Sequence, residues 1–367
     1  MQPRDLSAHV AYEAGGGLEE VARELGVDPG ELVKLASNEN PLGPSPAAVE
    51  AVRERVGSVH GYPKASVADL RAALAAEWDV AEPQVWPSPG ADGAIDLLSR
   101  ATLAPGDGAL VPEPGFAYYP MSTRYHHGTV RPYPVVEGDG AFEISPERVL
   151  DAYDGERLVY LTTPHNPTGA ELGLEGVRAV ADRTAEETLV AVDEAYGEFT
   201  DAPSAVELVA ERDDVAVLRT FSKAYGLAGL RLGYAVVPGE WADAYALVNT
   251  PFAVNELAAR AGLAALSDDD HVEETVAVAR RSRRRLRAEL DAPTYDSGGN
   301  FVLVDVGSVV GGEAAAERVA AAAEERGVIV RDCGSFGLAD HVRVSCGTDA
   351  ETDRAVAALN DALAELR

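Results

Sequence analysis

The sequence predicts an α/β protein: a large domain with a mostly parallel central sheet flanked by helices, followed by a smaller α+β domain. Short apolar runs alternate with helical stretches, which is typical of parallel α/β sheets. Several of these runs are apolar almost throughout, as expected for strands buried on both faces. The chain has 367 residues, a length that suits two domains or one domain with an added lobe.

The large domain is expected over residues 41–250. Ser45 and Pro46 predict the start of a helix over 45–56, because serine caps helices and proline suits the first helical position. A second helix is expected over 66–78 with Ser66 as its cap, and a third follows a glycine turn over 90–103. Apolar runs then predict strands at 108–114, 129–135, 157–164, 188–196, 215–222 and 231–237.

The pattern changes after about residue 250, and a small domain is expected over residues 251–367. A long helix is predicted over 270–290, and its arginine-rich stretch 280–287 is interpreted as a solvated face paired with carboxylates. Residues 1–40 are expected to form an N-terminal segment that packs with this domain. The remaining predicted elements are strands at 301–306, 328–333 and 341–346 and helices at 313–326 and 349–366.

The chain is strongly acidic, with 61 acidic and 31 basic residues and a formal net charge of −30. Only Lys34, Lys64 and Lys223 are lysines. Such a surface repels phosphodiester backbones and anionic membranes, so neither nucleic acid nor membrane is an expected partner. An acidic, lysine-poor composition is typical of proteins from salt-loving organisms; an acidic proteome from a GC-rich genome is the alternative.

Cys333 and Cys346 have no metal-finger spacing, so neither a disulfide framework nor a metal site is expected. The first residues lack an apolar signal segment, and no run of about 18 apolar residues occurs. We therefore expect a cytoplasmic protein. No G-x-G-x-x-G opens a βαβ unit, which argues against a dinucleotide-binding oxidoreductase.

Four short motifs lie at or just beyond the ends of predicted strands, where ligands collect in parallel sheets. Each motif alone is weak, but the four in this order are a specific signal. They are Pro164-His165-Asn166-Pro167-Thr168-Gly169, Asp193-Glu194-Ala195-Tyr196, Thr220-Phe221-Ser222-Lys223 and Gly229-Leu230-Arg231-Leu232-Gly233.

With these motifs the chain resembles the fold type I pyridoxal-phosphate-dependent transferases, in the aspartate aminotransferase superfamily. The branch that it resembles most is the histidinol-phosphate aminotransferases. Further matching stretches are Leu35-Ala36-Ser37-Asn38-Glu39-Asn40-Pro41, Tyr62-Pro63, Gly90-Ala91-Asp92, and Arg331 with Arg343-Val344-Ser345-Cys346-Gly347-Thr348. The resemblance covers nearly the whole chain and implies a cytoplasmic homodimer with shared active sites, in which residues 1–40 also contact the partner subunit.

The resemblance implies that Lys223 holds pyridoxal 5'-phosphate as an imine and moves the substrate proton. It implies that Asp193 keeps the pyridine nitrogen protonated; the alternative is that Asp193 only caps the following helix. Asn166 and Tyr196 match the residues that hold the ring oxygen. Phe116 is aligned with the aromatic that stacks on the ring, and Tyr118 or Tyr119 takes that place if the register shifts.

The cofactor phosphate needs hydrogen-bond donors and positive charge. The resemblance assigns it the side chains of Arg231, Ser222 and Thr220, and the backbone N–H groups at Ala91 and Asp92, at a predicted helix start where anions are favoured. Tyr62 matches a residue that reaches this phosphate from the other subunit, or is an ordinary turn tyrosine.

Arg343 matches the family residue that binds the substrate carboxylate. Arginine suits this role, because a guanidinium binds carboxylate or phosphate through two parallel hydrogen bonds. Arg331 is expected to supply a second cation for a phosphate dianion. Tyr12 matches a tyrosine near the substrate phosphate, or is an N-terminal packing residue. Asn38 or Asn40 is expected to line the imidazole pocket. The implied reaction transfers the amino group of L-histidinol phosphate to 2-oxoglutarate, giving imidazole-acetol phosphate and L-glutamate.

Three other activities remain open from the sequence. An aromatic or broad-range aminotransferase and a threonine-phosphate decarboxylase share this fold and its anion-binding arginines. A non-catalytic pyridoxal-binding regulator lies in a different class. That reading predicts an added DNA-binding module or a lost lysine, and the sequence has neither feature.

Overall fold

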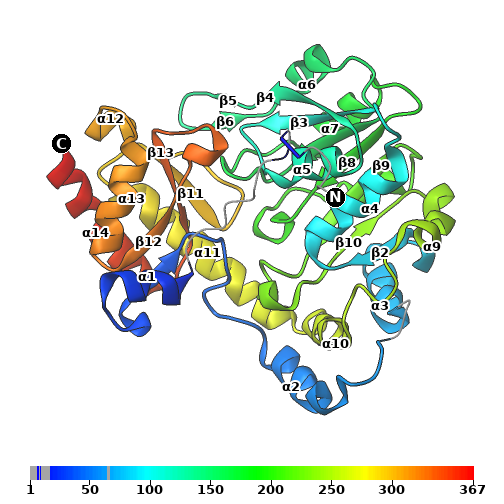
Figure 1. The fold of residues 1–367 in the computed structure, drawn as a ribbon, viewed down its shortest axis with the longest axis horizontal. Coiled ribbons are helices and arrows are strands. Elements are labelled where there is room, and N and C mark those ends of the chain that lie inside the picture. Colours follow the sequence, from blue (N-terminus) through cyan, green and yellow to red (C-terminus); the bar gives the residue numbers. More distant parts are fainter. Residues whose placement is uncertain (1–5, 8, 10–16, 64–66) are drawn as a thin grey trace.

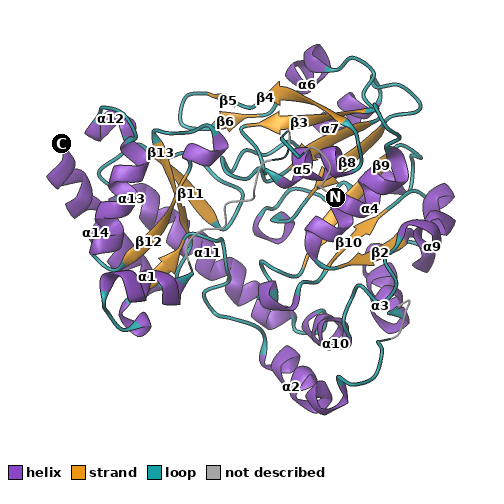
Figure 2. Ribbon diagram, viewed as in Figure 1, coloured by secondary structure: helices purple, strands orange, loops and turns teal. Residues whose placement is uncertain are grey.

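The computed structural model describes residues 6–7, 9, 17–63 and 67–367 and shows two sheets of unequal size, each covered by helices (Figures 1 and 2). A 7-stranded sheet forms the large domain. A 4-stranded sheet with α11 (Asp269–Glu289), α12 (Gly307–Val310), α13 (Ala315–Glu325) and α14 (Asp349–Leu366) forms the small domain. The predicted domain boundary at residue 250 stays a prediction. Helix α10 (Glu256–Ala265) follows that boundary in the sequence but packs on α2 (Pro46–Arg55) of the large domain.

The large sheet is mostly parallel, as predicted. Strands β9, β8, β7, β3 and β4 run parallel, whereas β10 is antiparallel to both of its neighbours, β2 and β9. In sheet order the strands are β2 (Val85–Ser88), β10 (Gly233–Val236), β9 (Val215–Thr220), β8 (Leu189–Asp193), β7 (Leu158–Thr162), β3 (Gly108–Glu113) and β4 (Thr129–Pro134). Because β10 is reversed, its amino end lies at the same edge as the carboxyl ends of the other strands.

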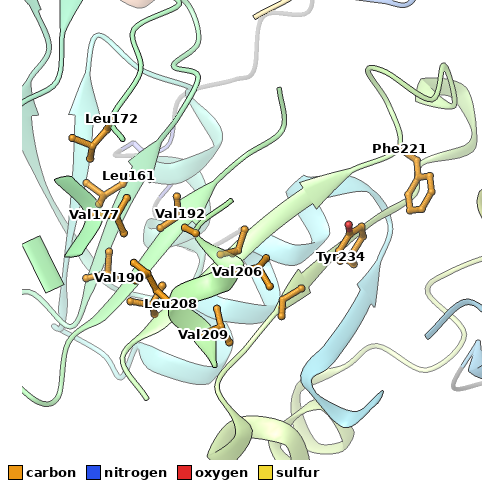
Figure 3. Packing of buried hydrophobic residues seen from close by; sticks show 14 of the residues in the cluster. Leu161, Leu172, Val177, Val190, Val192, Val206, Leu208, Val209, Phe221 and Tyr234 are labelled. Atoms are coloured by element: carbon orange, nitrogen blue, oxygen red, sulfur yellow. The ribbon is translucent and has the colours of Figure 1, made fainter. Parts of the chain in front are cut away.

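Two apolar layers bury the faces of this sheet. On one face, residues of α4 (Gly90–Thr102) and α5 (Tyr118–Tyr125) pack with Trp86 and Leu218. The other face is covered partly by α7 (Leu174–Ala181) and α8 (Val206–Val209), whose Val177 and Leu208 join one cluster with Val190 and Val192 of β8 (Figure 3). The alternation of β8 between the two layers explains why the sequence there is apolar throughout.

Local signals predicted two of the early helices close to their observed bounds, whereas α1 (Leu18–Leu25) was not predicted. Ser45 caps α2, with its Oγ accepting a hydrogen bond from the Ala48 N–H at 3.1 Å, and Pro46 is the first helical residue. The helix predicted over 66–78 is α3 (Ala68–Trp78), while Ser66 lies outside the described residues. The sequence analysis missed β2, because its four residues include Pro87 and follow a short turn.

The small sheet has the order β1 (Val33–Leu35), β12 (Val328–Asp332), β13 (His341–Ser345), β11 (Phe301–Asp305). Its edge strand β1 comes from the N-terminal segment and pairs in parallel with β12, and the sequence analysis did not predict this strand. The long α11 passes from the small domain toward α10 (Figure 1). The other elements are α1 (Leu18–Leu25), α6 (Pro146–Ala152), α9 (Tyr245–Val248), β5 (Val136–Glu137) and β6 (Phe142–Glu143).

The arginine-rich face of α11 pairs with carboxylates, as interpreted from the sequence. Arg280 contacts Asp201 at 2.6 Å and Arg287 contacts Asp296 at 2.6 Å. Arg283 differs, because its guanidinium donates to the carbonyl oxygens of residues 297 and 299, both at 2.7 Å. Through these contacts the arginine-rich stretch 280–287 stabilises the fold of this chain.

Neither cysteine is in a disulfide: Cys333 and Cys346 are both buried free thiols. Within the described ranges, no cluster of His, Cys, Asp and Glu side chains could hold a metal ion. A search of the same residues finds no helix that is long and apolar enough to cross a membrane.

Candidate active site

The predicted motifs meet at one edge of the large sheet. Thr162 ends β7 and is paired in register with Asp193, the last residue of β8. Gly233, the first residue of β10, is paired with both Thr220 and Ser88, the last residues of β9 and β2. Strand pairing therefore brings five separate segments of the chain to one place.

A cavity of about 590 Å³ opens at this edge and extends to the small domain. Its wall combines strand ends of the large sheet, the start of α4, residues 36–39 before α2, and residues of β12 and β13. Of the predicted site residues, the cavity is lined by Asn38, Ala91, Asp92, Phe116, Asn166, Asp193, Tyr196, Thr220, Ser222, Lys223, Arg231, Arg331 and Arg343.

Lys223 follows β9 by three residues and projects into this cavity. Its Nζ donates to the carbonyl oxygen of Ser37 at 3.1 Å and lies 5.7 Å from the centre of the Tyr196 ring. Burial, and then the positive charge of Arg343, lower the pKa of Lys223 to about 8. A lysine with this pKa is partly neutral near pH 7–8, the state in which an amine is a nucleophile and a proton acceptor.

Asp193 is a buried carboxylate at the inner wall. Its Oδ1 accepts a hydrogen bond from the Ala195 N–H at 2.9 Å, and its Oδ2 accepts one from the Tyr119 hydroxyl at 2.6 Å. Burial raises the pKa of Asp193 to about 6. A buried carboxylate with so few compensating partners is suited to pairing with a cation inside the cavity.

Tyr196 lies on a turn that a buried ion network fixes. Arg219 bridges Glu194 and Glu198, both at 2.7 Å, and the three side chains are 5–10% exposed. A Cβ on Gly197 would lie 2.4 Å from Arg219 Nη1, so the turn packs directly on the guanidinium. The Tyr196 hydroxyl accepts a hydrogen bond from Asn38 Nδ2 at 3.0 Å.

One end of the cavity is built for an anion. Gly90 begins α4 with φ +77°, and a Cβ there would lie 2.4 Å from Arg231 Nη2, so only glycine lets the guanidinium reach the helix start. The first N–H groups of a helix have no partner within it. Arg231 pairs with Asp92 at 2.9 Å, and Ser222 and Thr220 place hydroxyl groups beside this end. Burial raises the pKa of Asp92.

The cavity wall contributed by the small domain carries two guanidinium groups. Arg343 of β13 donates to the Ala36 carbonyl oxygen at 2.8 Å and to Asn166 Oδ1. Arg331 of β12 is paired in register with Arg343. Both lie against Phe336, with guanidinium carbons 5.6 Å and 5.8 Å from the ring centre for Arg331 and Arg343. An aromatic ring favours such cations, which lets two like charges share one wall.

The three aromatic candidates all line the cavity but differ in their partners. The Tyr118 hydroxyl donates to Asp96 at 3.0 Å, and the Tyr119 hydroxyl donates to Asp193. Phe116 lies edge-on to Tyr119, with ring centres 5.6 Å apart. The hydroxyl groups of the two tyrosines are thus engaged by carboxylates, and the stacking role of Phe116 stays a prediction.

Some cavity residues were not predicted. Thr162 could have been found from the strand-end rule, and Ser37 and Glu39 lie within a stretch already noted for its resemblance. Phe336 had no such signal, because it lies in a short turn between β12 and β13 and reaches the cavity only through the tertiary fold.

Among the described residues, two of the predicted ones do not line the cavity, Tyr62 and Asn40. Tyr62 is 88% exposed and packs on Phe252, with ring centres 5.0 Å apart. Tyr12 lies outside the described residues. Asn40 lies near the site but turns away from it, since its Nδ2 donates to the carbonyl oxygen of Ala224 at 2.9 Å and to Thr275 Oγ1 at 3.1 Å.

Sequence comparison identifies relatives along the whole chain. A family model described as aminotransferase class I and II matches residues 30–359. A protein of Natronomonas pharaonis named histidinol-phosphate aminotransferase is 65% identical over 363 residues, covering 99% of this chain and 100% of that protein. A protein of Halorubrum lacusprofundi with the same name is 64% identical over 366 residues, covering 100% of this chain and 98% of that protein.

Solved structures give the same result. Histidinol-phosphate aminotransferase from Sinorhizobium meliloti, in complex with pyridoxal-5'-phosphate, superposes with a TM-score of 0.86 at 29% identity over 96% of each chain. A double mutant of Thermus thermophilus aspartate aminotransferase has a TM-score of 0.80 at 28% identity over 93% of each chain. The chain therefore belongs to the class I and II aminotransferases and, within them, to the histidinol-phosphate aminotransferase family.

Proposed function

We propose that this protein is a pyridoxal-phosphate-dependent enzyme of histidine biosynthesis. It transfers the amino group of L-histidinol phosphate to 2-oxoglutarate and forms imidazole-acetol phosphate and L-glutamate. The observation that carries the proposal is one cavity lined by Lys223 and Asp193, with the helix start and Arg231 in the wall from the large domain and Arg331 and Arg343 in the wall from the small domain. The names of relatives at 65% and 64% identity support it.

The described residues fit the cofactor. Gly90 and Arg231 leave a close-fitting site for its phosphate, and the position of Asp193 in the inner wall suits a protonated ring nitrogen. Asn166 and Tyr196 offer an amide and a hydroxyl for the ring oxygen, and Phe116 offers a face for stacking. When bound, pyridoxal phosphate supplies an electron sink for the carbon that loses its proton.

Lys223 has two tasks in this proposal. Its Nζ would hold the cofactor covalently and, when free, would accept and return the proton of the substrate carbon. Its pKa of about 8 suits both tasks, because general acid–base catalysis is most effective when the pKa lies near the working pH. Asp193, when ionised, would hold a proton at the pyridine nitrogen.

Arg343 and Arg331 select the substrate. A guanidinium binds phosphate and carboxylate alike, so the same pair can accept the phosphate of histidinol phosphate in one half-reaction and a carboxylate of glutamate in the other. A phosphate dianion has more charge to neutralise than a carboxylate. We therefore assign Arg331 mainly to the phosphate. Asn38 and Tyr12 complete the proposed substrate site.

The substrate assignment is tested by mixing the loaded enzyme with single amino compounds and following the absorbance of the cofactor. We expect rapid loss of the absorbance band with histidinol phosphate, its return with 2-oxoglutarate, and much slower change with phenylalanine. Threonine phosphate should release no CO₂. Faster reaction with phenylalanine, or CO₂ release from threonine phosphate, would assign the protein to one of the alternative activities.

An Arg331→Gln variant refines this test. Loss of one phosphate contact should lower kcat/KM for histidinol phosphate by about tenfold or more, as expected for a hydrogen bond to a charged group. The value for glutamate should fall less. Equal losses for both substrates would contradict the assignment of Arg331 to the phosphate.

We further propose a cytoplasmic homodimer that binds no nucleic acid and in which Tyr62 completes the site of the partner subunit. Two exposed aromatic rings packed on each other, Tyr62 and Phe252, suit an interface better than a solvated surface. The net charge of −30 disfavours nucleic acid.

Mixing two inactive chains tests the shared site. A Lys223→Ala chain and a Tyr62→Ala chain, each inactive or impaired alone, should regain activity when subunits exchange, because one site of the mixed dimer then has both native residues. Exchange is verified with differently tagged chains, and mixing Lys223→Ala with itself is the control. Exchange without recovery would exclude a site shared through Tyr62.

A further inference from the structure

Tyr119 is a fully buried residue of α5 whose hydroxyl lies directly against Asp193. It is 1% exposed, and its Oη donates to Asp193 Oδ2 at 2.6 Å. Hydrogen bonds from a hydroxyl to an ionised carboxylate are among the strongest in proteins. Tyr119 was considered from the sequence only as an alternative stacking ring, and its observed contact gives it a different place in the site.

A second hydroxyl stands behind the first. Thr162 Oγ1 lies 2.9 Å from Tyr119 Oη. A tyrosine hydroxyl has one proton, and Tyr119 donates it to Asp193. The hydrogen bond between Thr162 and Tyr119 must therefore be donated by Thr162. The chain from Thr162 to Tyr119 to Asp193 is therefore polarised in one direction, and each bond strengthens the next.

Packing holds this arrangement in place. The Tyr119 ring is stacked on Tyr160, with centres 4.7 Å apart and planes 20° apart, and its edge contacts Phe116. The stacking on Tyr160, the contact with Phe116 and the hydrogen bonds of the hydroxyl together hold the ring in place. The Asp193 carboxylate is held on its other oxygen by the Ala195 N–H.

The charges around Asp193 show why such support matters. Burial, and then Asp92 on α4 and Glu194 beside it, raise the pKa of the Asp193 carboxyl. The hydroxyl of Tyr119 and the N–H of Ala195 act in the opposite direction. Without Tyr119, one backbone N–H is left to oppose burial and two neighbouring carboxylates.

We propose that Tyr119, supported by Thr162, is a positioning residue that keeps Asp193 ionised and oriented so that the carboxylate can hold a proton at the pyridine nitrogen of the cofactor. The inference rests on the proposed role of Asp193. It assigns to α5 and β7 a part in the chemistry although neither hydroxyl needs to touch the substrate.

The test measures binding to the cofactor-free protein, without turnover. Pyridoxamine 5'-phosphate and an analogue with a C–H group in place of the ring nitrogen are titrated into each variant. The Kd of the C–H analogue divided by the Kd of pyridoxamine 5'-phosphate reports how strongly the carboxylate favours the protonated nitrogen. In Tyr119→Phe we expect this ratio to fall by roughly tenfold or more, the effect of one hydrogen bond to a charged group.

Three further variants make the result specific. Thr162→Val keeps the shape of the side chain and should lower the ratio less than Tyr119→Phe, and it carries the test if Tyr119→Phe does not fold. Tyr133→Phe removes another fully buried hydroxyl, which donates to the Tyr160 carbonyl oxygen at 2.9 Å, and should leave the ratio unchanged. Asp193→Asn should abolish the preference for the nitrogen.

Each outcome decides a different point. A wild-type ratio in Tyr119→Phe, with a lowered ratio in Asp193→Asn, would overturn the inference and leave the proposed function intact. A wild-type protein that shows no preference for the ring nitrogen would overturn the role of Asp193 itself. Equal losses in Tyr119→Phe and Tyr133→Phe would show a general effect of buried hydroxyls and would also overturn the inference.

Discussion

Replacing Lys223 by alanine is expected to abolish transamination. The substitution removes both the covalent attachment of the cofactor and the group that moves the substrate proton. Loss of a general base alone lowers rates by about 10²–10⁴-fold, so the combined loss should exceed that range. The half-reaction with histidinol phosphate, followed by the absorbance of the cofactor, measures the effect.

The same lysine should be the site of covalent attachment. Borohydride reduction of the loaded enzyme, followed by peptide mapping, should place the pyridoxyl group on Lys223. Lys34→Arg is a matched control, because Lys34 pairs with Glu39 at 3.2 Å and arginine preserves that charge. An adduct on Lys34 or Lys64, or substantial turnover by Lys223→Ala, would disprove the assignment.

Replacing Asp193 by asparagine is expected to give the next largest effect. The amide can still accept the hydrogen bond from the Ala195 N–H, so the fold should persist. It cannot hold the ring nitrogen protonated, and the electron sink weakens. The half-reaction should slow by about 10²–10³-fold, the usual effect of removing one preorganised electrostatic group.

Asp96→Asn is the matched control for this variant. Asp96 is also a carboxylate that accepts hydrogen bonds from hydroxyl groups, those of Ser122 and Tyr118, but it does not line the cavity. Its replacement should affect stability more than rate. A native half-reaction rate in Asp193→Asn would mean that another anion protonates the ring.

The strand-end rule and the family resemblance together indicated most of the cavity residues. The rule located the motifs with Asn166, Asp193 and Lys223, because each lies at or just beyond the end of an apolar strand and the carboxyl ends of parallel strands share one edge. Arg231 fits the same edge for a reason that sequence alone did not supply. Arg231 lies just before β10, and β10 is antiparallel to both of its neighbours. The amino end of β10 therefore lies at the same edge as the carboxyl ends of the other strands.

The helix α10 was missed although Asn255 caps its start, whereas other missed features depend on distant partners. Strand β1 has three residues and becomes a strand only by pairing with β12, almost 300 residues later. The contact of Tyr119 with Asp193 joins α5 to β8, and nothing near either residue in the sequence indicates it. Local patterns carry information about periodicity and turns, whereas such contacts follow from packing.

The buried ion pairs of Arg219 with Glu194 and Glu198 are expected to respond little to salt concentration, which is high where the halophilic relatives of this chain live. The Debye length shrinks from about 10 Å at 0.1 M salt to about 3 Å at 1 M, which weakens ion pairs that face water and largely spares those that water does not reach. Exposed pairs such as Arg285 with Asp353 therefore respond to the ionic medium, whereas the turn carrying Tyr196 is held by charges that dissolved ions do not reach. The surface of the enzyme can change with salinity while the geometry around its reacting atoms stays the same.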